Sequence, residues 1–199
     1  MSMWKKLKEI FGVQPEANDK GAEDQDLIIF RKKEPIDVQF TRNFVAGGGM
    51  FFYSENEQEV LINLKSIIEN EGIDELICYE KDLNSLLNRL NVKGINDFNQ
   101  DADFAFIKCE YLVAFDGSVM LSSDTNKGRK QEEMPVNLII YATPNQFVSN
   151  VSEALQKLKS AKKDNIPSNI SSVRGRNMHD VEASVSSKNI YLILAEAIK

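Results

Sequence analysis

Short apolar runs alternate along this chain with longer segments of helical periodicity, and this alternation restricts its possible folds more than any other feature. The apolar runs cover residues 50–53, 76–79, 104–107, 119–121, 138–142 and 190–194. Each run has the length and side-chain composition of a buried strand. Because helices repeatedly separate such strands in βαβ units, we predict a three-layer α/β/α domain with a mostly parallel sheet.

Helices are predicted where apolar residues recur every three or four positions. These segments are residues 35–46, 54–72, 83–90 and 143–162. Ser54 and Thr143 are the expected N-caps, because a Glu or Gln that can complete a capping box follows each of them three residues later. The glycines at 47–49 come after a helix and before a strand, which is the order of a helix stop and not of a phosphate-binding loop.

The first 26 residues differ from the rest of the chain. Residues 1–11 place Trp4 and Phe11 at helical spacing with other apolar residues and predict a short amphipathic helix. Such a helix favours docking in a protein groove over a membrane surface, since one or two lipid-facing turns attach weakly. Residues 12–26 have the composition of a disordered acidic linker. Residues 27–199 are then expected to form one α/β domain.

The charge and the cysteine content limit the possible partners and compartment. A formal net charge of -6 over 199 residues argues against sequence-independent nucleic-acid binding, so an anionic ligand would need a local basic pocket. Cys78 and Cys109 lie in apolar runs far apart in the sequence, as expected of buried free thiols in the reducing cytoplasm. No run of about 18 apolar residues could form a transmembrane segment.

Several chemistries lack the residues that they need. His179 is the only histidine, which excludes metal sites built on two imidazoles. Two distant cysteines cannot supply the four thiolates of an iron-sulfur cluster, so we expect no cofactor or metal in this chain. Asp101 and Asp103 could bind magnesium, but two acids before a strand are more typical of a solvated loop. The sequence also lacks the serine-hydrolase elbow and the dinucleotide-binding glycine pattern.

The stretch 101–123 places two apolar runs on either side of Asp116, Gly117 and Ser118. Turn chemistry favours a hairpin here, because Asp-Gly is a common turn pair. The same three residues offer an acceptor, a close backbone approach and a hydroxyl donor, so a ligand site is the alternative.

Four segments of the sequence together resemble the LUD (lactate utilization) domain family. They are YLVAFDGSVMLSS, the pair Gly128-Arg129, MPVNLIIYA and VSNVSEALQKL. The resemblance runs from about Glu57 to the C-terminus. The family it points to is that of lactate-utilization protein C and its relatives. It implies a sheet related to those of sugar-phosphate isomerases and CoA transferases. It also implies a role in the conversion of L-lactate to pyruvate beside iron-sulfur oxidoreductase subunits.

The sequence departs from the family pattern at three places. Phe115 stands where the family commonly has the glutamate of a Glu-Thr-Gly-Thr-like turn, and Asn137 stands where a histidine is frequent. The C-terminal Gly-Pro-Ser-Arg-like loop is replaced by residues 175–179. The resemblance therefore implies the fold more directly than any catalytic residue.

Polar residues near the predicted strand ends form the candidate ligand-binding set, and no catalytic residue is assigned. The set is Lys108, Asp116, Gly117, Ser118, Arg129, Asn137, Arg174, Arg176 and His179. A parallel sheet would bring such residues to its C-terminal edge, where ligands bind in open α/β folds. We predict that Arg174 and Arg176 with Ser118 hold a small anion, either a carboxylate or a phosphate. An exposed basic loop is the equal alternative.

Three functions remain open from the sequence. The resemblance implies an accessory component of L-lactate oxidation that acts with iron-sulfur partner subunits. A non-catalytic anion-binding or sensor module is the second possibility. An isomerase-like or CoA-transferase-like enzyme is the third, and Phe115 in place of the family glutamate counts against it.

We predict that removal of residues 1–26 leaves the domain folded, because the linker contributes little apolar burial. The thermal unfolding midpoint, measured by circular dichroism, should shift little from that of the full chain. A large drop would mean that Trp4 and Phe11 pack into the domain, and their role as a tether would then be wrong.

Overall fold

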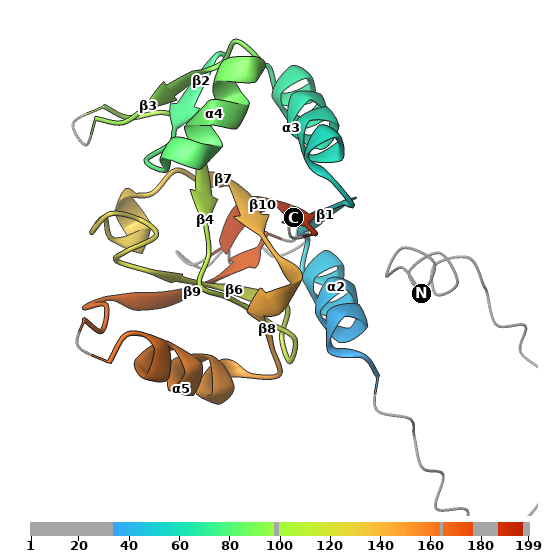
Figure 1. Cartoon of the computed structure of the whole chain (residues 1–199), viewed down its shortest axis with the longest axis vertical. Coiled ribbons are helices and arrows are strands. Elements are labelled where there is room, and N and C mark those ends of the chain that lie inside the picture. The colour runs from blue at the N-terminus through green and yellow to red at the C-terminus, as the bar shows by residue number, and fades with distance from the viewer. Residues whose placement is uncertain (1–33, 98–99, 164, 177–186, 197–199) are drawn as a thin grey trace, which may run out of the picture.

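The computed structural model describes residues 34–97, 100–163, 165–176 and 187–196 (Figure 1). Its helices are α2 (Ile36–Ala46), α3 (Glu57–Glu71), α4 (Lys81–Arg89) and α5 (Val151–Ala161), with 3₁₀ turns η1 (Gln131–Glu133) and η2 (Pro144–Gln146). Its strands are β1 (Met50–Ser54), β2 (Glu75–Ile77), β3 (Lys93–Ile95), β4 (Phe104–Lys108), β5 (Tyr111–Val113), β6 (Ser118–Ser122), β7 (Asn137–Ala142), β8 (Phe147–Val148), β9 (Ile170–Gly175) and β10 (Ser187–Ala195). The helix and linker predicted for residues 1–26 lie outside the described residues.

A parallel sheet forms the centre of the fold, with the strand order β3-β2-β4-β7-β10-β1. Strands β4, β7 and β10 are mostly apolar and buried, because a parallel sheet that is covered on both faces has no solvent-facing side. The arrangement confirms the predicted α/β class and the mostly parallel sheet.

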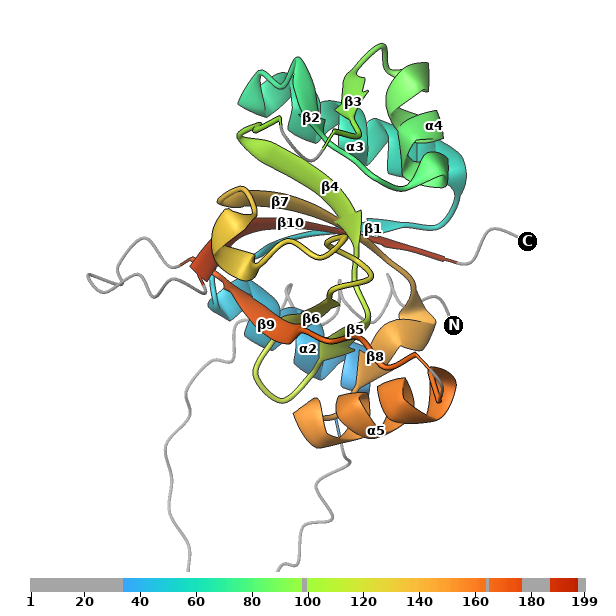
Figure 2. The ribbon, with the colours of Figure 1, turned by 90° about the vertical axis from the view of Figure 1, so that its left-hand side faces the viewer.

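Strand β10 joins the parallel strands to a second, curled part of the sheet. Residues 191–195 of β10 pair with β1, whereas residues 187–188 pair with β9. From β9 the sheet continues through β6 and β5 to β8, and the β9–β6 and β6–β5 pairs are antiparallel. Figure 2 shows this curled part below the parallel strands.

Apolar side chains fill both faces of the parallel sheet. Helices α3 and α4 cover one face, where Leu64 and Leu83 belong to the same cluster as Phe106. The opposite face packs on α2 and the curled strands, and α5 covers the outer side of those strands (Figure 2). One outer layer is thus built from a helix together with the curled part of the same sheet. No helix in the described ranges is long and apolar enough to cross a membrane.

Strand β9 is the main element that the sequence pattern does not predict, since the sequence places Arg174 and Arg176 together in a loop. Its two central serines are half-buried, and only Val173 is fully buried, so its local pattern is weak. Backbone pairing with β6 and β10 makes it a strand, because tertiary context can outweigh local propensity. The short strands β3, β5 and β8 arise in the same way.

Ser54 is not the N-cap of α3, contrary to the prediction. It lies in β1, where it pairs with Ala195, and its hydroxyl accepts a hydrogen bond from Asn63. Because the sheet holds Ser54 in an extended conformation, the N-cap of α3 lies two residues later than predicted, and the helix begins at Glu57. Asn56 is the cap, and its side chain accepts a hydrogen bond from the amide of Glu59 at 3.0 Å.

Thr143 forms the predicted capping box with Gln146, but the box closes only the short turn η2. The Gln146 side chain also donates a hydrogen bond to the carbonyl of Cys109, at 2.5 Å. The following two residues pair with β5 as β8, so the chain adds a strand before the helix. Asn150 is the actual N-cap of α5.

The turn between β5 and β6 packs tightly against the end of α2. Gly117 has a φ of +67°, and a Cβ atom there would lie 2.5 Å from the carbonyl carbon of Asn43. The Asn43 side chain donates hydrogen bonds to the carbonyls of Ala114 and Phe115, at 2.8 and 3.1 Å. The predicted Asp-Gly hairpin is confirmed, and its glycine allows two backbones to touch.

We predict that Gly117→Ala destabilises the protein more than Gly72→Ala does. Gly72 has a nearly equal φ of +64°, but no atom lies within 4 Å of the position of an added Cβ. The control should therefore show only the left-handed backbone cost, about 1 kcal/mol. Overpacking against rigid backbone should add roughly 1–3 kcal/mol to the Gly117 variant. Urea unfolding measures both changes, and equal values would contradict the tight contact.

Candidate functional site

The strand register divides the predicted site residues between the two edges of the parallel sheet. Asn137 begins β7 and lies level with Phe104, the first residue of β4, and with Asn189 near the start of β10, so it marks the N-terminal edge. Arg174 pairs with Ser187 at the start of β10 and lies near this same edge, because β9 ends where β10 begins. Lys108 instead ends β4 at the C-terminal edge. The prediction that these side chains meet at the C-terminal edge is therefore wrong.

Asp116 connects the hairpin turn to β9. Its carboxylate accepts hydrogen bonds from the amide and the hydroxyl of Ser118, at 3.1 and 2.7 Å. The same carboxylate forms an ion pair with Arg174, whose side chain is 62% exposed. Three of the predicted site residues are thus in direct contact, and Gly117 lies between two of them.

The hydrogen bonds around Asp116 favour its charged form. Burial alone would raise the pKa of this carboxyl, but the hydrogen bonds from Ser118 and Arg174 outweigh burial and lower the pKa below its usual value. Ser118 is fully buried, and its hydroxyl donates a hydrogen bond to the carboxylate of Asp116. This geometry indicates that the turn mainly fixes β9 against the hairpin. Arg176 is exposed after β9, and His179 lies outside the described residues.

Arg129 is a nearly buried cation on the loop between β6 and β7. Only 9% of the residue is exposed. Its guanidinium donates hydrogen bonds to the carbonyls of Gln100 at 3.2 Å and Glu133 at 3.4 Å. Its Nη1 atom lies 3.7 Å from the carboxylate of Asp101, whose side chain is 99% exposed. Burial raises the pKa of Tyr79, and a hydrogen bond with Arg129 opposes that shift.

Two adjoining hollows lie beside Arg129. Arg129, Asp101 and Glu133 line both of them. One, of about 520 Å³, is also lined by Lys127 and Gly128. The other, of about 260 Å³, is lined by both apolar and polar side chains, from chain segments at the start of β4 and β7. Its remaining lining residues are Ile77, Ala102, Asp103, Met134, Pro135, Val136 and Asn137. The structure thus brings Arg129 and Asn137 of the predicted set to one hollow.

Local contacts fix the loop that carries Arg129. Gly128 has a φ of +83°, and its amide donates to the carbonyl of Ser123 at 2.8 Å, which closes the turn. Lys127 pairs with Glu80 at 2.7 Å. The buried Lys188 donates a hydrogen bond from Nζ to the carbonyl of Met134 at 2.9 Å, and burial lowers the pKa of this amine.

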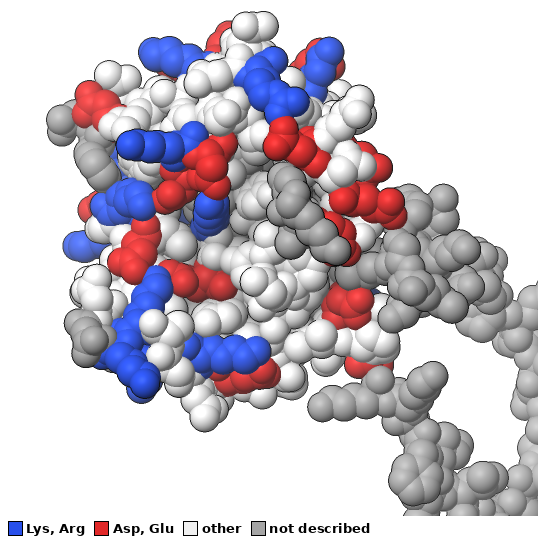
Figure 3. Space-filling view, viewed as in Figure 1, with Lys and Arg blue, Asp and Glu red and all other residues white. Residues whose placement is uncertain are grey.

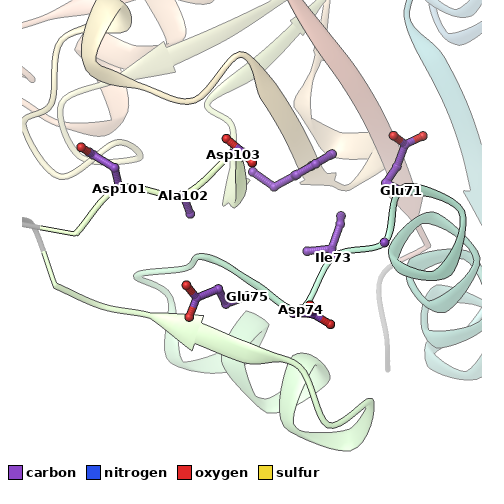
Figure 4. Close-up of a pocket in the computed structure, with 9 residues that line it drawn as sticks. Glu71, Ile73, Asp74, Glu75, Asp101, Ala102 and Asp103 are labelled. Carbon is purple, nitrogen blue, oxygen red and sulfur yellow. The ribbon is translucent and has the colours of Figure 1, made fainter.

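A third hollow, of about 440 Å³, is lined by acidic residues of two turns (Figure 4). Its carboxylates belong to Glu71, Asp74, Glu75, Asp101 and Asp103. Figure 4 shows that these carboxylates do not converge on one point. Within the described ranges, no group of three or more His, Cys, Asp or Glu residues is placed to hold a metal ion. Asp101 and Asp103 line this hollow, and the Asp101 side chain is 99% exposed.

Lys108 occupies a separate cluster at the C-terminal edge. Its Nζ atom lies 2.5 Å from the carboxylate of Asp82. Tyr141 pairs with Lys108 in the strand register. Burial raises the pKa of the Tyr141 hydroxyl, and the positive charge of Lys108 opposes part of this shift. On the face shown in Figure 3, basic and acidic side chains are interspersed. Sequence reasoning missed Asp82 and Tyr141, because the placement of α4 brings the first to Lys108 and the strand register brings the second.

The two cysteines are buried free thiols, as predicted. Burial raises the pKa of Cys78 to about 12 and also raises the pKa of Cys109. Since the thiolate is the reactive form, neither side chain is poised as a nucleophile.

Comparisons with known proteins agree with this architecture. A family model described as LUD domain matches residues 19–195. The fold is similar to the crystal structure of a DUF162 family protein from Deinococcus radiodurans, with a TM-score of 0.58 and 14% sequence identity. That match covers 81% of this chain and 96% of the other, and at this identity it concerns the fold alone. No curated protein matches the chain.

We predict that Asp116→Asn loses stability at neutral pH and that the loss shrinks in acid. A carboxyl whose folded-state pKa is lowered stabilises the fold above its unfolded pKa of about 3.9, and this contribution disappears as the pH falls through the folded pKa. The loss at pH 7 should be on the order of 1 kcal/mol, because charged hydrogen bonds become neutral ones. Urea unfolding at pH 7 and pH 3 measures it.

The control is Asp101→Asn, which changes an exposed side chain and should have little effect on unfolding at either pH. An Asp116→Asn protein as stable as the wild type at pH 7 would contradict the role of this carboxylate.

Proposed function

This chain belongs to the LUD domain family, and we propose that it is an accessory component of the oxidation of L-lactate to pyruvate. In this proposal it acts with partner subunits that carry iron-sulfur clusters. The observation that carries the proposal is the family match over residues 19–195, which includes every described strand and helix. The proposed location is the cytoplasm, in keeping with the two free thiols.

The composition of the chain supports this division of labour. Oxidation of a 2-hydroxy acid to a 2-oxo acid releases two electrons and two protons. An iron-sulfur cluster takes four thiolates, and this chain has only Cys78 and Cys109, both buried. In the proposal, the partner subunits therefore supply the cluster, and this chain holds a small anionic metabolite or positions the partners.

A small-anion binding or sensor module is the second candidate. The nearly buried Arg129 beside a hollow supports it, because a guanidinium in a partly dry site suits a carboxylate. An isomerase-like or CoA-transferase-like enzyme has less support. The family glutamate is replaced by Phe115, which is 73% exposed, and the neighbouring carboxylate of Asp116 is engaged by Ser118 and Arg174.

We predict that a strain lacking this chain fails to grow on L-lactate. Growth on pyruvate should continue, because pyruvate enters metabolism after the step in question. Growth curves on the two carbon sources measure this, and a plasmid copy of the chain should restore growth on lactate.

Normal growth on L-lactate in a deletion strain that carries no second copy would contradict the lactate proposal. If the purified chain still bound a small anion, the second candidate would then be favoured.

A further inference from the structure

We propose that the tip of the hairpin between β5 and β6 is a contact surface for a second copy of this chain, with Phe115 as its apolar anchor. This hairpin-tip surface consists of Phe115, Val151 and the ion pairs Asp116–Arg174 and Glu153–Lys157. The inference goes beyond the lactate proposal and does not depend on it. It rests on an exposed aromatic ring, a rigid backbone beneath the ring and a balanced charge around it.

The first feature is the exposure of Phe115. Its exposed fraction of 73% is the highest among the large apolar side chains of the described ranges, and no other aromatic ring there is as open to solvent. Val151, which is 39% exposed, lies two residues after Ser149, whose carbonyl accepts a hydrogen bond from the Phe115 amide. The two apolar side chains therefore belong to one surface. Aromatic side chains are enriched at protein interfaces relative to other surfaces.

The second feature is the backbone that carries the ring. The amide of Phe115 donates to the carbonyl of Ser149 at 3.0 Å, and the Phe115 carbonyl accepts from the side chain of Asn43 at 3.1 Å. The next residue, Asp116, is held by Ser118 and Arg174. Because these contacts already order the turn, little backbone freedom remains to be lost on binding. The ring is thus a preorganised anchor for an interface.

The third feature is the charge balance of the hairpin-tip surface, which favours a second copy as the partner. The chain has a formal net charge of -6, so two copies repel each other wherever their acidic surfaces meet. Next to Phe115, the carboxylate of Asp116 is paired with Arg174, and that of Glu153 pairs with Lys157 at 2.9 Å. These pairs add no net charge, so two such surfaces can approach each other without strong repulsion.

A two-fold axis close to the turn suits this arrangement. In a two-fold dimer the same patch meets itself, so the ring of Phe115 packs on the ring of its symmetry mate. The cation of each ion pair can then face a carboxylate of the other copy. Because only two apolar side chains form the centre of the contact, we expect a weak dimer with a dissociation constant of about 10 to 100 µM.

Sedimentation velocity of the purified full chain at about 1 to 400 µM tests the proposal. The wild type should shift from monomer to dimer over this range. Phe115→Ser removes the anchor and should weaken dimerisation by about thirtyfold or more. Ile62→Ser is the matched control, because Ile62 is 60% exposed on α3, which covers the other face of the sheet. Its dissociation constant should equal the wild-type value.

Phe115→Glu is a second variant, and it tests the position of the axis. Two carboxylates would meet near the axis and repel each other, so this variant should stay monomeric over the whole concentration range. Thermal unfolding at about 1 µM, where the wild type is monomeric, should give the same midpoint for all three variants and the wild type. A Phe115 variant that unfolds there would contradict the exposed position of the ring, and the proposal with it.

The proposal is overturned if the wild type stays monomeric throughout this range, or if Phe115→Ser and Ile62→Ser dimerise alike. Two further results would assign the surface to a different occupant. Dimerisation only after removal of residues 1–26 would mean that the N-terminal segment covers the surface in the full chain. A monomeric wild type that binds a purified iron-sulfur subunit, with binding lost in Phe115→Ser, would mean that a different protein docks there.

Discussion

The close backbone contact around the end of α2 is the interaction on which the arrangement of the two parts of the sheet depends. The hairpin turn reaches the helix at Gly117, and the end of β9 reaches the loop before β1 at Gly175. A Cβ at Gly175 would lie 2.5 Å from the amide nitrogen of Gly49. Side chains larger than hydrogen at either contact would force the curled strands away from α2, and the core between them would lose its packing.

The sequence predicts those parts of the fold whose side chains carry their own periodic signal. The α/β class, the end of α3 at Gly72 and the buried strands β7 and β10 follow from apolar periodicity and a left-handed glycine. Strand β9 and the start of α5 do not follow, because they depend on pairing with segments far away in the chain. A capping box such as that of Thr143 predicts a helical turn but not the length of the helix.

The candidate site was harder to predict than the fold, since it depends on which charges the fold neutralises. The sequence includes Arg129 and Arg174 in the candidate set and favours Arg174 as the anion ligand. Only the structure shows that Arg174 is exposed and paired with a carboxylate, whereas Arg129 is nearly buried beside the exposed Asp101. Register decides the edge at which each residue lies, and here it depends on pairing between strands that are far apart in the sequence.

The place of β10 in the sheet also sets an order for its assembly on the ribosome. This strand follows all the other described strands in sequence, yet it lies between β7 and β1 and also pairs with β9. While the chain emerges, β1 and β7 have no neighbour between them, and their apolar edges remain open until β10 leaves the exit tunnel. The central part of the native sheet therefore closes only after β10 has been synthesised, and the edges of β1 and β7 stay unpaired until then.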